Sequence, residues 1–464
     1  MEDLTQLLLN KLAQISDWQQ RTLVLGYSGG VDSEVLAFGL SLLKQRLPAI
    51  KIKLVYVHHG LSINADNWSR HCQSRAEKYQ LPFVVKHVTV NQAARTSLEA
   101  EARKVRYRAF FEEMQDGDIL LTAHHQDDQF ETLLLALKRG QGPKGLSAMA
   151  PLQPVKKTKW QLRPLLDVPR ADIEAYAADN QLSHIEDESN QDTRFDRNFL
   201  RQQVIPLLKQ RWPSITKTAS RTAQLCADQQ LLLEEVVSER LKPFIVTTAF
   251  ADHVFDLSDL AELSHTWQRQ LFRGFIEKLS LPVPSKIQLD EVLSQLLNAK
   301  QDATVELKVS GLVIRRFKQH VYVCANDDNT LVSCNTLELS GFHETIEQKG
   351  EYIFTHNACK SFLFSNCEQE SQFQSISQAI KRPKPTDVVT IRFTVAGGSL
   401  CHPHFRNKRR SVKKLMQELN IPPWERKRIP FLFYGEELIA ALGFWVERSA
   451  CVSMEQAGIV INQP

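Results

Sequence analysis

The stretch from Leu23 to Ser33, LVLGYSGGVDS, decides the fold at the N-terminal end of the chain. Its apolar start predicts a buried strand, and the apolar residues that recur at helical spacing from Val35 to Leu43 predict a helix. A strand, a glycine turn and a helix in this order present backbone N–H groups and the positive end of a helix to a phosphate. The sequence therefore predicts a phosphate-binding turn at the glycines.

This glycine turn is not a Walker motif. The pattern GxxxxGK[ST] is absent, because no lysine follows Gly29 and Gly30. The segment SGGVDS resembles instead the pyrophosphate-binding loop of the PP-loop ATP pyrophosphatase superfamily, in which ATP is cut between its α and β phosphates. The carboxylate of Asp32 suits a magnesium ion that bridges phosphates. The residues expected to bind ATP are Ser28, Gly29, Gly30, Val31, Asp32 and Ser33.

The composition is that of a globular protein of several domains. The chain has 464 residues, of which 43% are hydrophobic and 24% charged, and its length suits about three domains. The net charge is only +4, so affinity for nucleic acid requires local basic clusters. The eight cysteines form no CxxC pair, so reduced thiols are expected, with neither a zinc or iron–sulfur site nor a disulfide framework. Neither a secretory signal nor a membrane span is expected, which predicts a cytoplasmic protein.

Residues 1 to 212 alternate between predicted strands and helices. The predicted strands are Leu23–Tyr27, Ile52–Val57, Phe83–Val88 and Ile119–Thr122. The predicted helices are Val35–Gln45, Asp66–Tyr79, Leu98–Glu113 and Gln129–Lys138. This alternation predicts an α/β domain whose parallel sheet is covered by helices on both faces. Ligands of such sheets bind beyond the carboxyl ends of the strands.

Two further polar stretches follow predicted strands. HHG stands at His58 to Gly60, and HHQDD stands at His124 to Asp128. Histidines and aspartates can form a transition-metal site, but the helical HExxH spacing is absent, which favours ligand contacts or helix caps. Asp127 is placed to cap the helix that follows. Asp128 and Asp32 together offer two carboxylates to a magnesium–ATP complex.

The segment from Gly140 to Gly145 matches GxGxxG, but its context is wrong for a dinucleotide site. It follows a helical run instead of a strand. We interpret it as the end of a helix and a turn, with Pro143 preventing continuation.

Two pairs of arginines lie close enough to share a helix face. Arg103 and Arg106 occur in SLEAEARKVRYRAFF, and Arg197 and Arg201 occur in IEDESNQDTRFDRNFLR. The first pair is expected to point toward a common neighbour, and the second pair could form an anion clamp. A solvated basic face is the alternative for the first pair, and the acidic residues around the second are typical of helix caps.

Helical periodicity replaces the alternation from Pro213 onward. Residues 213 to 327 predict a mainly helical middle domain with a β-hairpin that turns near Gly311. Asp327 to Asn329 is the expected linker. Residues 328 to 464 contain predicted strands such as Tyr352–Thr355 and Val388–Phe393, and they predict an α+β, β-rich C-terminal domain.

The C-terminal domain contains a dense basic cluster. Such a cluster is often a solvated face, but here Trp424 and the cations from Arg426 to Arg428 follow it closely. A basic surface beside an aromatic residue suits a phosphate backbone, and such binding weakens steeply with salt. The residues expected to bind RNA are Arg406, Lys408, Arg409, Arg410, Lys413 and Lys414.

Seven motifs occur together and in order: SGGVDS, HHG, EARKVRY, AHHQDDQFET, RGQGPKGLSAM, RPLL and EDESNQDTRFDRNFLR. In this combination the chain resembles the tRNA(Ile)-lysidine synthetases of the long, three-domain bacterial form. The stretch LMQELNIPPWERKRIPFLFYGEELIAALGFWV resembles the terminal domain of the same family. The resemblance covers the chain from about residue 20 to its end.

The resemblance implies a PP-loop, Rossmann-like N-terminal domain and a defined reaction. The substrates would be tRNA(Ile) with a CAU anticodon, ATP with Mg²⁺, and free L-lysine. The family adenylates O2 of the wobble cytidine and releases pyrophosphate, and the ε-amine of lysine then attacks the activated carbon and expels AMP. Whether the chain forms a homodimer is left open by the sequence.

The same resemblance assigns roles to residues. It points to four catalytic residues, Asp32, Asp128, Arg106 and Arg201. Asp32 and Asp128 would share the magnesium ion. Lysine must lose its ammonium proton before it attacks, which requires an acidic residue in the pocket, and Glu131 is the candidate. The other candidates for substrate contact are His124, Arg103 and Arg197.

Three alternatives remain at this point. A PP-loop enzyme that thiolates tRNA usually shows cysteine pairs, which this chain lacks. A non-catalytic RNA-binding module with a decayed nucleotide site is opposed by the intact turn and by Asp128. A metal-dependent phosphoesterase that uses the His/Asp cluster would need bound zinc or manganese and no ATP.

Overall fold

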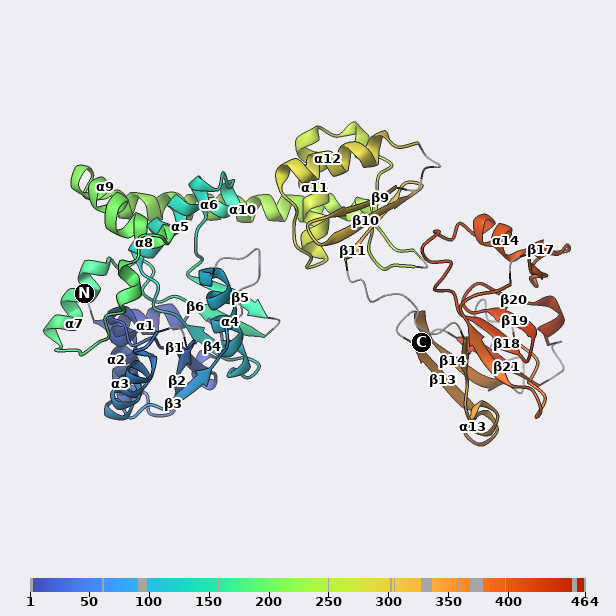
Figure 1. Cartoon of the computed structure of the whole chain (residues 1–464), viewed down its shortest axis with the longest axis horizontal. Coiled ribbons are helices and arrows are strands. Elements are labelled where there is room, and N and C mark those ends of the chain that lie inside the picture. Colours follow the sequence, from blue (N-terminus) through green and yellow to red (C-terminus); the bar gives the residue numbers. More distant parts are fainter. Residues whose placement is uncertain are drawn as a thin grey trace. The chain divides into compact units, whose positions relative to one another are not determined.

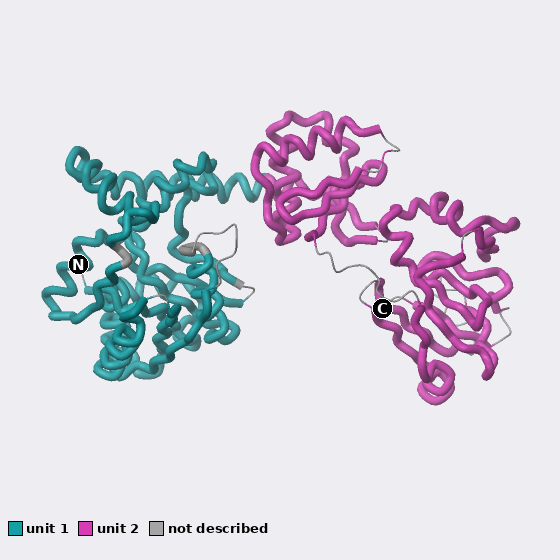
Figure 2. Tube along the Cα trace, viewed as in Figure 1, with its two compact units in different colours: residues 1–236 teal, residues 237–464 magenta. Residues whose placement is uncertain are grey.

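The structure is a computed structural model. It describes residues 3–462 except residues 61, 91–97, 157, 249, 301–302, 304, 327–335, 357–358, 368–378, 397 and 453–456. The chain divides into two compact units, Met1–Val236 and Val237–Pro464 (Figure 2). The boundaries that we predict at residues 212 and 327 stay predictions, and the expected linker at 327–329 lies outside the described residues.

Unit 1 contains a six-stranded sheet in the order β3-β2-β1-β4-β6-β5 (Figure 1). The strands are β1 Thr22–Gly26, β2 Lys51–His58, β3 Phe83–His87, β4 Ile119–Leu121, β5 Leu152–Lys156 and β6 Lys159–Leu162. Neighbouring strands are parallel except β5 and β6. The strand order reverses between β1 and β4, and that is where ligands of such sheets bind.

Helices cover both faces of this sheet, as predicted. They are α1 Leu4–Leu12, α2 Val31–Arg46, α3 Ala65–Lys78, α4 Leu98–Glu112 and α7 Arg170–Asp179. Leu23 and Leu25 of β1 pack into a core with residues of α1, α2, α3 and α7. Val24, which points to the opposite face, packs with Phe110 of α4.

All four predicted strands and all four predicted helices are present, with shifted ends. Helix α2 begins at Val31 instead of Val35, and α5 (Gln126–Lys138) begins before Gln129. The first turn of each helix is mostly polar, with Asp32 to Glu34 in α2 and Gln126 to Gln129 in α5, so hydrophobic periodicity detects only the later turns. The helices α1 and α7 and the β5–β6 pair were not predicted.

A group of helices after the sheet packs around α5. Its members are α6 Pro143–Leu146, α8 Asp196–Phe199, the π-helical segment η3 Leu200–Val204, α9 Ile205–Arg211 and α10 Ile215–Leu241. Phe130 of α5 shares a small core with Ile205 and Ala219, which brings η3 next to α5. The GxGxxG segment is the predicted turn, with Gly140 at φ +61° and Pro143 at the start of α6.

Unit 2 begins with helices and an antiparallel sheet. The helices are α11 His265–Lys278 and α12 Lys286–Asn298. The sheet order is β7-β8-β11-β10-β9, with β7 Ile245–Val246, β8 Val254–Asp256, β9 Val305–Val309, β10 Leu312–Phe317 and β11 His320–Ala325. The predicted hairpin is β9–β10, and Ser310 and Gly311 at its turn have φ +50° and +76°.

The rest of unit 2 is rich in β-structure, as predicted. One sheet has the order β12-β15-β18-β19-β20, a second β13-β14-β21 and a third β16-β17. The strands are β12 Thr336–Glu338, β13 Glu351–His356, β14 Cys359–Cys367, β15 Val389–Arg392, β16 Leu400–Cys401, β17 Arg410–Ser411, β18 Phe431–Tyr434, β19 Glu437–Ala441, β20 Trp445–Val446 and β21 Gly458–Asn462. The helices are α13 Phe342–Lys349 and α14 Val412–Glu418.

Candidate active site

The turn after β1 requires glycine at position 29. Gly29 has φ +81°, in the left-handed region. A Cβ atom there would lie 2.4 Å from Ile185 Cδ1 and 2.7 Å from Cys72 Sγ. The Ile185 N–H also donates a hydrogen bond of 2.8 Å to the Gly29 carbonyl. The turn is thus pressed against two segments behind it, and a larger residue does not fit.

Two serine hydroxyls close the turn. Ser33 Oγ donates to the Gly30 carbonyl at 3.0 Å and accepts from the Ser28 N–H at 3.3 Å. Ser28 Oγ lies 3.1 Å from Ser33 Oγ. Gly30 is the N-cap of α2, and no side chain caps the first N–H groups of this helix. Uncapped N–H groups at a helix N-terminus are suited to an anion such as pyrophosphate.

A buried polar network lies behind the turn. The Glu34 carboxylate is fully buried and accepts hydrogen bonds from Tyr27 Oη, from Tyr79 Oη at 2.5 Å and from Arg75 Nε at 2.6 Å. Burial and the neighbouring carboxylate raise the pKa of Tyr27 above its usual range. Tyr27 therefore stays protonated and donates to Glu34.

Asp32 and Asp128 approach the same imidazole from the first turns of α2 and α5, the helices that follow β1 and β4. His125 Nε2 lies 3.7 Å from Asp32 Oδ2 and 3.5 Å from Asp128 Oδ2. Asp32 Oδ1 is buried and has no hydrogen-bond partner among the described residues. Burial raises the pKa of Asp32, against the effect of His125 and Arg170. An orphaned carboxylate oxygen beside a second carboxylate fits a hard cation such as Mg²⁺.

The expected cap of α5 by Asp127 is wrong. His125 is the N-cap, and its ring and the Asp128 carboxylate form a reciprocal capping box, with His125 N–H donating to Asp128 Oδ2 at 3.0 Å. Asp127 instead accepts the Arg170 N–H at 3.0 Å, at the start of α7, and pairs with Lys209. Sequence alone misplaced the cap because the partners of Asp127 are distant in the chain.

Arg201 joins two of the predicted carboxylates. Its NH2 donates to Asp128 Oδ1 at 3.2 Å, and its Nε donates to Glu131 Oε1 at 2.7 Å. Burial alone would raise the pKa of Asp128, but His125 and Arg201 outweigh burial, and the pKa lies below its usual range. Burial raises the pKa of Glu131, against the opposing effect of Arg201. The two carboxylates of α5 therefore differ in proton affinity, which is lower for Asp128 and higher for Glu131.

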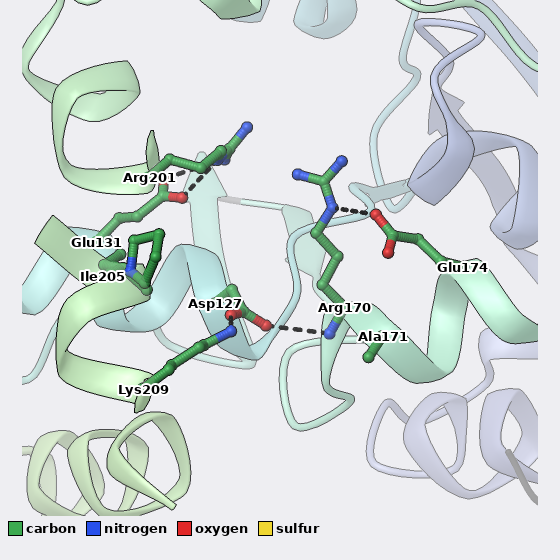
Figure 3. Close-up of a pocket in the computed structure, with 9 residues that line it drawn as sticks. Asp127, Glu131, Arg170, Ala171, Glu174, Arg201, Ile205 and Lys209 are labelled. Carbon is green, nitrogen blue, oxygen red and sulfur yellow. Dashed lines mark hydrogen bonds and ion pairs between the residues drawn. The ribbon is translucent and has the colours of Figure 1, made fainter. Parts of the chain in front are cut away.

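A pocket of about 270 Å³ opens beside this cluster (Figure 3). Arg201 and Glu131 lie together on one wall, while Arg170 and Glu174 of α7 lie on the opposite wall. Asp127 lies between these walls, where Lys209 and the Arg170 N–H both reach it. The lining residues are Asp127, Glu131, Arg170, Ala171, Glu174, Arg201, Ile205, Pro206 and Lys209.

The remaining predicted contacts lie at neighbouring strand ends. Arg106 Nε donates to His59 Nε2 at 3.2 Å, beyond β2. The Arg103 guanidinium lies 5.1 Å over the Tyr107 ring. His124 follows β4, and its Nδ1 lies 3.0 Å from Thr122 Oγ1. Arg197 is in α8, one turn before Arg201.

The predicted RNA-binding cations differ in their surroundings. Arg406 and Arg410 both pair with Glu418 of α14. The other four are exposed: Lys408, Arg409, Lys413 and Lys414. The Trp424 ring packs against Phe317 and Tyr322, with ring centroids 6.2 and 5.4 Å apart. The aromatic residue expected beside the cluster is thus engaged within unit 2.

Several polar residues near the site were missed from the sequence. They are Glu34, Arg75, Thr122, Gln161, Arg163, Arg170 and Lys209. A signal was available for two of them, because Glu34 interrupts an otherwise apolar helical face and Arg163 is the first residue of the motif RPLL.

Searches against known proteins give one consistent result. The tRNA(Ile)-lysidine synthase of Shewanella oneidensis is 47% identical over 94% of this chain and 93% of that protein. The chain belongs to the tRNA(Ile)-lysidine synthase family. The enzyme of the same name from Shewanella woodyi is 47% identical over 94% of this chain and 92% of its own length. The one from Edwardsiella ictaluri is 39% identical over 92% and 91%. The resemblance predicted from the motifs is confirmed.

Family models match in three places. A PP-loop domain matches residues 4–208, a TilS substrate binding domain 255–322, and a TilS substrate C-terminal domain 389–463. A solved structure, the U34-tRNA thiolase NcsA of Methanococcus maripaludis, has 17% identity and a TM-score of 0.41 over 49% of this chain and 79% of that chain. That likeness is too distant to bear on function.

Within the described residues, no group of three or more His, Cys, Asp or Glu side chains is arranged to hold a metal ion. Among those same residues, none of the helices combines the length and apolar character that a membrane span requires.

Proposed function

We propose that this chain uses ATP to join lysine to C2 of the wobble cytidine of tRNA(Ile) with a CAU anticodon, which produces lysidine. Membership of the tRNA(Ile)-lysidine synthase family over 94% of the chain carries the proposal. The phosphate-binding type of turn supports it, because the reaction needs ATP. Thiolation is not favoured, because the similar proteins are lysidine synthases.

In the first step the cytosine O2 attacks the α-phosphorus of ATP, the bond between the α-phosphorus and the bridging oxygen breaks, and pyrophosphate leaves. The N–H groups at the start of α2 and the hydroxyls of Ser28 and Ser33 hold the departing pyrophosphate. Asp32 and Asp128 would hold Mg²⁺, which would neutralise charge on the phosphates. Arg106 and Arg201 act around the nucleotide and the activated base. Adenylation replaces one difficult displacement by two easier ones.

In the second step the ε-amine of lysine attacks C2, the C2–O bond breaks, and AMP leaves with the oxygen. The amine must first lose a proton. Glu131 is the residue that we assign to this task, because its pKa is raised by burial and it is therefore a better base than an ordinary glutamate. The pocket beside Glu131, about 270 Å³ in volume, is the site that we assign to free lysine.

The tRNA must present a single unpaired cytosine to this edge of the sheet, so the base leaves the anticodon stack. His124, Arg103 and Arg197 are the candidate contacts for it. The exposed cations around Arg409 and Lys413 are the candidate contacts for the tRNA backbone. A homodimer and a cytoplasmic location stay predictions.

The test is transfer of labelled lysine to total bacterial tRNA in the presence of ATP. The expected result is label in one isoleucine tRNA, dependent on ATP and abolished by Asp32→Ala. Asp179→Ala is the matched control, because Asp179 is an exposed carboxylate at the end of α7. Label that enters tRNA without ATP, or equal activity in the two variants, would contradict the proposal.

A further inference from the structure

A line of hydrogen bonds lies behind His124. His124 Nδ1 is 3.0 Å from Thr122 Oγ1, which is 3.1 Å from Gln161 Nε2. Gln161 Oε1 is in turn 3.0 Å from an N–H of Arg163. Thr122, Gln161 and Arg163 are 6%, 1% and 3% exposed, so no bulk solvent competes for these bonds. The line connects the ends of the neighbouring strands β4 and β6.

Arg163 fixes the direction of the Gln161 amide. A guanidinium can only donate hydrogen bonds, so the amide atom that faces Arg163 must be the oxygen. Gln153 Nε2 donates to the same oxygen at 3.0 Å. The amide nitrogen therefore faces Thr122, and its other N–H donates to the Tyr107 hydroxyl at 3.1 Å.

The direction of the Gln161 amide fixes the hydroxyl of Thr122. Because Gln161 donates to Thr122 Oγ1, the hydroxyl proton of Thr122 points elsewhere. Among the described residues, His124 Nδ1 is the acceptor within its reach. A buried hydroxyl that failed to donate would leave its proton without a hydrogen-bond acceptor, which is unfavourable. His124 Nδ1 thus accepts, and the ring proton lies on Nε2.

We propose that His124 acts as a neutral imidazole whose Nε2–H donates a hydrogen bond to an oxygen of the substrate, and that Gln161 and Thr122 are positioning residues that set this tautomer. The proposal rests on the proposed function and deepens it. The receiving oxygen is the one that links the cytosine to the adenylate phosphorus. That oxygen gains negative charge as lysine attacks C2, so a fixed donor stabilises the departure of AMP.

The charges around His124 agree with a neutral ring. Burial lowers the pKa of His124 to about 3, and Arg163, Arg103 and Arg197 act in the same direction against Asp128. These groups come from α4, α5, α8 and the end of β6. The imidazolium form is therefore scarce at neutral pH. The ring donates a hydrogen bond as a neutral imidazole and does not transfer a proton from its charged form.

The direct test is ¹⁵N NMR of the full chain labelled at histidine. The chain has 14 histidines, and the His124 signals are assigned by their loss in His124→Gln. The expected result at pH 7 is a proton on Nε2 alone. A proton on Nδ1, or on both nitrogens, would overturn the proposal. Because no reaction is needed, this result is independent of whether the chain makes lysidine.

Paired variants test the function of the tautomer. Thr122→Val removes the hydroxyl, and the expected result is a mixture of tautomers by NMR and a kcat reduced by roughly 10- to 100-fold, with a nearly unchanged KM for ATP. Thr122→Ser restores the hydroxyl and should recover most of the kcat. Equal kcat in the two variants, with both folded by circular dichroism, would overturn the role of Thr122.

A second pair of variants distinguishes donation from Nε2 of His124 from donation from Nδ1. The amide nitrogen of a glutamine reaches about as far as Nε2 of histidine, whereas that of an asparagine reaches only about as far as Nδ1. His124→Gln should therefore retain more kcat than His124→Asn, which should lose roughly 100- to 1,000-fold, as for the loss of a transition-state donor. The reverse order would contradict donation from Nε2. A wild-type chain that never transfers lysine would refute the proposed function instead.

Discussion

Tyr27 and Glu34 are hydrogen-bonded to each other across the glycine turn. Tyr27 immediately precedes Ser28, and Glu34 immediately follows Ser33, so their bond closes the whole turn from behind. Arg75 holds the same carboxylate from α3 through an ion pair of 2.6 Å, with the Glu34 side chain fully buried. The turn is therefore held from behind by a buried ion pair, in addition to the hydrogen bonds of its own serine side chains.

Glu34→Gln is expected to weaken ATP binding more than it slows the chemical step. The variant keeps the size of the side chain but leaves the Arg75 charge buried without its partner, which destabilises the fold by about 3–5 kcal/mol. The loosened turn should raise the KM for ATP several-fold. Steady-state kinetics with varied ATP and a thermal unfolding curve measure the two effects.

The control for this variant is Tyr79→Phe. It removes two hydrogen bonds of 2.5 Å, one donated to the Glu34 carboxylate and one accepted from Arg75, and it leaves the ion pair between Arg75 and Glu34 in place. A loss of about 2 kcal/mol, less than that expected for Glu34→Gln, and a normal KM are expected. A Glu34→Gln enzyme with wild-type KM for ATP would show that the network supports the fold without positioning the turn.

Much of the fold and part of the site follow from the sequence, and Asp127 shows where sequence reasoning ends. The rule that ligands bind at strand ends brought the glycine turn and HHQDD together, since β1 and β4 are neighbours. The partners of Asp127, Glu34 and Gln161 come from segments that are adjacent only after folding. Local patterns find helix ends and turns, but they do not say which distant backbone N–H or guanidinium reaches a given carboxylate or amide.

Asp127→Asn should destabilise the protein at neutral pH and cease to do so in acid. Burial raises the pKa of Asp127, but the bonds from Lys209 and from the Arg170 N–H outweigh burial, so the pKa lies below its usual range. A lowered pKa means that the ionised carboxylate stabilises the fold above the ordinary pKa of an aspartate, and that this stabilisation is lost as the pH falls through the folded-state pKa.

The expected difference between wild type and Asp127→Asn at pH 7 is about 1–3 kcal/mol. Thermal unfolding from pH 7 down to pH 3 measures it, and the two Tm values should converge toward the acid end. Glu174→Gln is a suitable control, because Glu174 pairs with Arg170 on an exposed helix surface and should change the Tm little. A difference that grows in acid would contradict the assigned direction of the pKa shift.

Cys72 is expected to resist alkylation in the folded protein. The thiol is fully buried beneath Gly29, and burial together with Glu34 raises its pKa to about 12. The thiolate is the reactive form, so Cys72 should stay unmodified by N-ethylmaleimide at pH 8. The exposed Cys324 provides the internal control and should react. Mass spectrometry of peptides distinguishes the two, and rapid modification of Cys72 without unfolding would contradict its burial.

The exposed cations of the C-terminal domain should contribute more to tRNA binding than the paired ones. Arg409 and Lys413 are exposed, whereas Arg410 is held by Glu418 at 2.5 Å. Each phosphate contact that is lost lowers the slope of log K against log salt by about 0.7–0.9. The double variant Arg409→Ala/Lys413→Ala should thus weaken binding and reduce the slope of log K against log salt by up to about 2. Arg410→Ala should change both the affinity and the slope less. Filter binding of tRNA(Ile) at several salt concentrations measures the slopes, with Lys349→Ala of α13 as a control away from the cluster. A slope unchanged in the double variant would remove this surface from the interface, because electrostatic contacts with phosphate must appear in the salt dependence.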